Sequence, residues 1–115
     1  MTREELLRLR DIGDAIDDIR ERQAEARDAG LGADSPLLRD ALLYKLVVIG
    51  EAVKNVSEDM RRRRPEVSWK GIAGLRDLLA HGYFRIQMNR IEEIVDQELE
   101  PLAEAVRALI ADQKS

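Results

Sequence analysis

Apolar side chains recur every three or four positions along most of the chain, which is the spacing of one face of an α-helix. The clearest case is the segment 3–28, whose apolar line consists of Leu6, Leu9, Ile12, Ile16 and Ile19. Gly30 and Gly32 follow this segment, and glycine is common just beyond a helix C-terminus. The pattern therefore predicts a long amphipathic helix that these glycines end.

A second helix is predicted to begin at Ser35 and Pro36, because serine is a favoured N-cap and proline is favoured at the first helical position. It is expected to run to about Arg62, shortly before Pro65. Its middle, ALLYKLVVIGEAV, is apolar on nearly every side, and such a helix must be covered on more than one face. It is therefore the central core helix, part of the seam of an oligomer, or both. Gly50 within it suggests that another helix approaches closely there.

Two further helices complete the pattern. Ser68 is a candidate cap for a helix over residues 69–80, with Gly82 as its stop. The last helix is predicted over residues 87–112, where Pro101 is expected to kink or divide it. Its apolar line is Ile91, Ile94, Val95, Leu99, Leu102, Val106, Leu109 and Ile110. No segment alternates apolar and polar residues for long enough to predict a strand.

Length and composition add to this picture. With 115 residues, the chain is expected to be one domain, spanning 1–115, and an all-α bundle of four to five helices. The absence of cysteine excludes disulfides, thiolate zinc sites and cysteine nucleophiles, and it favours the cytoplasm. The charged N-terminus is not that of a signal peptide. The longest apolar run, residues 46–49, is too short to span a membrane.

Charge is unevenly distributed along the chain, whose net charge is −4. Residues 61–90 contain eight basic and two acidic side chains, a balance of +6, whereas the remaining residues have a balance of −10. Such a split can mark a site for a polyanion. The candidate RNA-contacting groups are Arg61, Arg62, Arg63, Arg64, Lys70 and Arg85. Two simpler explanations stay open: a solvated surface, and cations that favour a helix C-terminus.

The stretch RDLLAHGYF contains the single histidine of the chain, His81, together with Arg76 and Tyr83. Arg76 and His81 are five positions apart, about 140° around an ideal helix, so they converge only if the helix ends or unwinds near His81. Gly82 favours such an end. A structural role is the simpler interpretation of this short pattern on spacing alone.

An arginine and a histidine without a metal suit RNA cleavage. The histidine can take the proton of the 2′-hydroxyl, and the arginine can stabilise charge on the phosphorane. The single histidine and the lack of a carboxylate pair make a metal site built by the protein unexpected, and no glycine-rich phosphate loop is present. The leaving oxygen also needs an acid, and a two-fold dimer would supply a second histidine.

Three longer stretches resemble the HepT-like family of HEPN domains, over roughly residues 9–109. They are YKLVVIGEAVKNVSEDMR (44–61), RPEVSWKGIAGLRDLLAHGYF (64–84) and DQELEPL (96–102). The resemblance implies an all-α homodimer that acts as the ribonuclease toxin of a two-gene toxin–antitoxin module. It also implies a minimal nucleotidyltransferase antitoxin as the partner.

The family motif R-x4-H-x-Y matches this chain at Arg76, His81 and Tyr83. The resemblance implies that the first two are the catalytic pair at the dimer cleft and that Tyr83 is where the antitoxin attaches adenylyl groups. Added phosphates would place negative charge where RNA phosphate must sit. HEPN domains often have asparagine after the motif arginine, and this chain has Asp77, an acid that would lower affinity for RNA.

The leading hypothesis is a metal-independent endoribonuclease without a cofactor, active as a homodimer. Glu51 is a further candidate site residue, although a solvated helix glutamate is the simpler account of it. The alternative is a non-catalytic binding module that docks a nucleotidyltransferase and presents its substrate. A purely structural helical dimer is the third interpretation.

Overall fold

Helices make up the fold throughout the part of the chain that the structure describes. The computed structural model describes residues 1–32, 34–82 and 88–113, where it contains six helices and no strand. They are α1 (Arg3–Asp28), α2 (Pro36–Lys54), α3 (Glu58–Arg63), α4 (Trp69–Ala73), α5 (Leu75–Gly82) and α6 (Met88–Asp112). The predicted all-α fold is confirmed. None of the described helices is long and apolar enough to cross a membrane.

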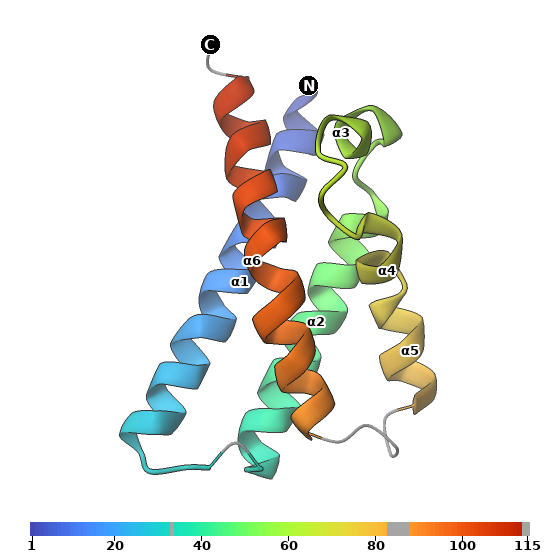
Figure 1. Cartoon of the computed structure of the whole chain (residues 1–115). Helices are drawn as coiled ribbons and strands as arrows, with labels where there is room; N and C mark the ends of the chain where they lie inside the picture. The colour runs from blue at the N-terminus through green and yellow to red at the C-terminus, as the bar shows by residue number, and fades with distance from the viewer. Residues whose placement is uncertain (33, 83–87, 114–115) are drawn as a thin grey trace.

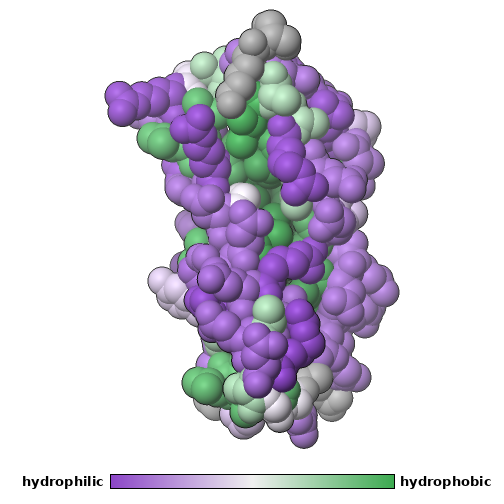
Figure 2. All heavy atoms as spheres, turned by 90° about the vertical axis from the view of Figure 1, so that its left-hand side faces the viewer, coloured by the Kyte–Doolittle hydropathy of each residue, from purple (hydrophilic) through white to green (hydrophobic). Residues whose placement is uncertain are grey.

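The three long helices, α1, α2 and α6, form the body of the bundle (Figure 1). The short helices α4 and α5 pack against α2, on the side of α2 away from α1. The predicted apolar lines of the first and last helices face the core. Its fully buried side chains include Leu9, Ile12, Ile19, Leu46, Ile49, Ile91, Leu99, Leu102 and Leu109. Viewed from the side of α1, the surface is mostly hydrophilic and is crossed by a narrow hydrophobic seam (Figure 2).

The first helix begins and ends as its sequence predicts. Thr2 and Glu5 form a reciprocal capping box at its N-terminus. At its C-terminus, Gly30 has a φ of 72°, which glycine adopts without strain. The N–H of Gly30 donates to the carbonyl of Arg27, and the N–H of Leu31 donates to the carbonyl of Ala26. This pair of bonds is a Schellman motif, which stops α1.

The second helix ends earlier than predicted, at Lys54 instead of about Arg62. Ser57 caps a new short helix, α3, by accepting a hydrogen bond from the N–H of Met60. The Arg61 guanidinium donates to the carbonyl oxygens of Val53 and Val56, at 2.8 and 3.1 Å. Val53 lies in the last turn of α2 and Val56 lies just beyond its end, so a side chain from the next helix supplies hydrogen bonds to carbonyl groups on both sides of the break.

Two more boundaries differ from the prediction. The helix expected over residues 69–80 is divided at Gly74 into α4 and α5. The structure describes α5 as far as Gly82, and the residues beyond this predicted stop lie outside the described range. By contrast, α6 continues through Pro101 without being divided. Leu99 and Leu102 are fully buried on either side of this proline, so core packing holds the helix together where proline removes one backbone hydrogen bond.

Candidate active site

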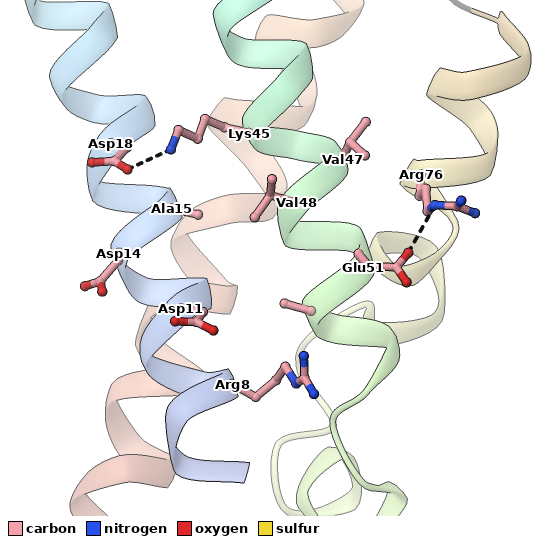
Figure 3. Close-up of a pocket in the computed structure, with 11 residues that line it drawn as sticks. Arg8, Asp11, Asp14, Ala15, Asp18, Lys45, Val47, Val48, Glu51 and Arg76 are labelled. Atoms are coloured by element: carbon pink, nitrogen blue, oxygen red, sulfur yellow. Dashed lines mark hydrogen bonds and ion pairs between the residues drawn. The ribbon is translucent and has the colours of Figure 1, made fainter. Parts of the chain in front are cut away.

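Arg76 lies in the first turn of α5, and its side chain is half exposed. Its Nε is 3.1 Å from Oε2 of Glu51, which projects from α2 (Figure 3). One terminal nitrogen, Nη1, is 3.5 Å from Oδ1 of the neighbouring Asp77. The sequence separated Glu51 from the R-x4-H-x-Y motif by 25 positions, and the fold brings the two together.

The close approach of α5 to α2 depends on Gly50. A Cβ atom at this position would lie 3.1 Å from the carbonyl oxygen of Ile72 and 3.2 Å from the backbone nitrogen of Arg76. Both distances are shorter than an ordinary van der Waals contact with carbon. The close helix approach predicted at Gly50 is therefore confirmed, and it occurs at the backbone of the candidate catalytic arginine.

His81 lies in the last turn of α5 and is exposed. Its Nδ1 is 2.8 Å from the backbone carbonyl oxygen of Asp77. A carbonyl oxygen can only accept, so Nδ1 carries the proton and donates it. In the neutral imidazole, the lone pair then resides on Nε2. This is the atom available to take a proton from a substrate.

Arg76 and His81 were expected to converge only if the helix ended or unwound near His81, and the helix does not unwind between them. The helix α5 is continuous from Leu75 to Gly82 and includes both Arg76 and His81. Five helical steps separate their Cα atoms by about 7.5 Å along the axis and about 140° around it. Tyr83 and Arg85 lie outside the described residues.

The basic residues of the 61–64 segment have different surroundings. Besides the bonds of Arg61 to the end of α2, Arg63 pairs with Asp59 at 2.8 Å and Arg64 pairs with Asp112 at 3.3 Å. Arg62 and Lys70 are exposed. Arg61, Arg63 and Arg64 thus have contacts within the fold, which accounts for part of the positive charge in this segment without a ligand.

A hollow of about 510 Å³ opens between α1 and α2 and reaches Arg76 (Figure 3). Asp11, Asp14 and Asp18 line it from α1, and Val47 and Val48 line it from α2. This row of acids was not among the site residues expected from the sequence, although their spacing of three and four residues places them on one helix face.

One ion pair crosses this hollow. Lys45 donates to Oδ2 of Asp18 at 2.9 Å (Figure 3). This hydrogen bond, together with the positive charge of Lys45, lowers the pKa of the Asp18 carboxyl below its ordinary value. In the described part of the chain, no group of three or more histidine, aspartate and glutamate side chains is arranged to hold a metal ion.

The arrangement around α5 provides two chemical functions. Arg76 presents a cation on a half-exposed side chain, and His81 presents a ring nitrogen whose tautomer is set by the backbone. Where such a cation and such a proton acceptor meet, they can bind a phosphodiester and remove a proton from a hydroxyl next to it.

Comparison with known proteins identifies the family. The sequence profile of the ribonuclease HepT-like family matches residues 12–109. "Probable ribonuclease HepT" from Thermococcus cleftensis is 33% identical over 94 residues, which cover 82% of this chain and 84% of that protein. "Putative RNase TTE0752" from Caldanaerobacter subterraneus subsp. tengcongensis is 38% identical over 79 residues, or 69% of this chain and 70% of that protein.

A third relative matches a shorter part. "Putative RNase MJ0127" from Methanocaldococcus jannaschii is 43% identical over 72 residues, which cover 63% of this chain and 60% of that protein. No solved structure matches. The profile match spans most of the chain, and the first two relatives are matched over more than two thirds of their length. The chain therefore belongs to the ribonuclease HepT-like family.

Proposed function

We propose that the chain is a metal-independent endoribonuclease, active as a homodimer, that serves as the toxin of a toxin–antitoxin module. The observation that carries the proposal is the hydrogen bond from His81 Nδ1 to the Asp77 carbonyl oxygen. It leaves Nε2 as a base on an exposed residue, in the helix that also carries Arg76. Membership of the family and the names of the relatives support the same activity.

The proposed reaction has one displacement step. Nε2 of His81 takes the proton of the ribose 2′-hydroxyl, and the resulting oxygen attacks the adjacent phosphorus. The bond from phosphorus to the 5′-oxygen breaks, and that oxygen takes a proton from a protonated His81 of a second copy. Arg76 stabilises the charge that develops on the non-bridging oxygens. The products are a 2′,3′-cyclic phosphate and a free 5′-hydroxyl.

Dimerisation is part of this proposal because one chain supplies only one histidine. Within α5, His81 and Arg76 also point in directions about 140° apart, by helix geometry. A second copy packed against the exposed side of α2 would bring its own His81 toward the Arg76 of the first copy. The face of α2 next to Glu51 carries Tyr44, which is 66% exposed, and the partly buried Val47 and Val48.

The test is RNA cleavage by the purified protein, with and without EDTA. We expect cleavage that EDTA does not abolish, with products ending in a cyclic phosphate. His81→Ala and Arg76→Ala should each lower the rate by at least about a hundredfold, while Glu104→Gln, at an exposed position of α6, keeps it. Activity that survives His81→Ala would exclude this mechanism.

Regulation by a nucleotidyltransferase antitoxin is the second part of the proposal. Tyr83 follows His81 by two positions, so an adenylyl group on it would bring phosphate charge close to the RNA-cleaving group. Co-expression with the antitoxin is expected to add the mass of adenylyl groups to the peptide containing Tyr83 and to abolish cleavage. Tyr83→Phe should remain unmodified and escape inhibition.

One observation favours the alternative of a non-catalytic module that docks a nucleotidyltransferase. Arg76 lies between two carboxylates, those of Glu51 and Asp77, and their combined negative charge weakens the attraction of the guanidinium for RNA phosphate. If the purified dimer binds a nucleotidyltransferase but cleaves no RNA in any tested pool, the alternative replaces the ribonuclease proposal.

A further inference from the structure

The Glu51 carboxylate contacts the inner part of the Arg76 guanidinium. The contact is made to Nε, at 3.1 Å, and the terminal nitrogens lie on the far side of the guanidinium from Glu51 (Figure 3). A guanidinium can bind an oxyanion through the edge formed by its terminal nitrogens while Nε is bound elsewhere. Among the described residues, the contact that competes for that edge is the one between Nη1 and Asp77, at the long distance of 3.5 Å.

We propose that Glu51 is a positioning residue for Arg76, which it holds by Nε so that both terminal nitrogens face the scissile phosphate. This inference rests on the proposed ribonuclease function. Two parallel hydrogen bonds to a phosphate require a fixed orientation of the guanidinium plane. A long, exposed arginine side chain has that orientation only when a second contact restricts its rotation.

The surroundings of the pair indicate that orientation, not stability, is its main effect. The Arg76 side chain is 50% exposed and the Glu51 side chain is 53% exposed, and ion pairs with this exposure add little to the stability of a fold. The position before Glu51 is Gly50, which lets the backbone of Arg76 approach α2. Neighbouring residues of α2 therefore fix both the backbone and the side chain of Arg76.

Steady-state cleavage of a short RNA by Glu51→Ala and Glu51→Gln tests the proposal. Loss of one charge-assisted hydrogen bond at an exposed site corresponds to about a tenfold change. We therefore expect kcat of Glu51→Ala to fall about tenfold while KM changes less. Gln keeps an oxygen that can accept from Nε, so Glu51→Gln should have an intermediate kcat. Glu104→Gln is the matched control, and all three variants should unfold at the wild-type temperature.

A double-mutant cycle separates positioning from an independent structural role. If Glu51 acts only through Arg76, Glu51→Ala should have no further effect on cleavage in the Arg76→Ala background. A wild-type rate in Glu51→Ala, or losses that multiply in the double variant, would overturn the positioning role and leave the ribonuclease proposal intact. Absence of cleavage by the wild-type chain would overturn the ribonuclease proposal instead.

A measurement without RNA tests the contact itself. The Nε–H of Arg76 should give a ¹H–¹⁵N resonance that exchanges slowly with water in the wild-type protein. It should exchange faster in Glu51→Ala and remain slow in Glu104→Gln. Equal exchange rates in all three proteins would contradict the inferred contact whether or not the chain cleaves RNA.

Discussion

Asp77 contacts both candidate catalytic side chains, through two different groups. Its carboxylate lies 3.5 Å from Nη1 of Arg76, and its backbone carbonyl accepts a hydrogen bond from the Nδ1–H of His81. The carbonyl sets the tautomer of the base and would be provided by any residue at this position. The carboxylate is specific to aspartate and adds a negative charge next to the proposed phosphate site. One residue would therefore have a favourable and an unfavourable effect on the proposed reaction.

Asp77→Asn is expected to strengthen RNA binding. The substitution removes the charge that competes for Arg76 and keeps the backbone carbonyl that bonds to His81. Exposed ion pairs are worth up to about 1 kcal/mol, so KM for RNA should fall by at most about fivefold. Measurements of kcat and KM at low and high salt would show the change, with the larger effect at low salt. An increase in KM would contradict this account of Asp77.

Gly50→Ala tests the close approach of α5 to α2, with Gly13→Ala as its control. At Gly13, in α1, an added Cβ would lie 3.9 Å from a Val106 methyl group, an ordinary contact. Alanine there should raise the unfolding free energy by about 0.5–1 kcal/mol. At Gly50 the added Cβ meets backbone atoms at 3.1 and 3.2 Å, so this gain should be absent and RNA cleavage should fall. Equal gains at both positions in chemical unfolding would contradict the close approach.

The helices that could be predicted from the sequence are those whose apolar periodicity coincides with clear end signals. The glycine that stops α1 is a local sequence feature. The apolar line of α6 can likewise be recognised from the sequence of that helix alone. The end of α2 could not be predicted, because buried Val53, Val56 and Met60 continue the apolar spacing across it. The contact of Glu51 with Arg76 joins residues 25 positions apart, so no local pattern indicates it.

Arg61→Ala should destabilise the junction of α2 and α3. Arg61 is partly buried, and its two hydrogen bonds go to the carbonyl oxygens of Val53, in the last turn of α2, and Val56, between α2 and α3. Their loss should lower the unfolding free energy by about 1–2 kcal/mol. Arg62→Ala, one position away and exposed, should change it by less than about 0.5 kcal/mol. Chemical unfolding measures the unfolding free energy of both variants. Equal losses in the two variants would exclude the capping role of Arg61.

The bundle leaves one side of α2 incompletely covered. Its other sides pack on α1, α4, α5 and α6, whereas Tyr44 is exposed and Val47 and Val48 are only partly buried. This uncovered strip continues into the hollow that reaches Arg76. A second copy on the strip would bury apolar surface and also bring a second His81 toward the first site. Stability and activity would then depend on the same contact.

The dimer predicted from this strip can be tested by adding charge to it. Tyr44→Glu places a carboxylate where the second copy would pack, and the cost of burying it should convert the protein to monomers. Gln97→Glu, an exposed position of α6, adds the same charge elsewhere and should leave the dimer intact. Light scattering after size exclusion measures the mass, and the wild-type unfolding temperature should rise with protein concentration. A Tyr44→Glu monomer that cleaves RNA at the wild-type rate would show that one chain contains the complete site, and the need for a second histidine would be wrong.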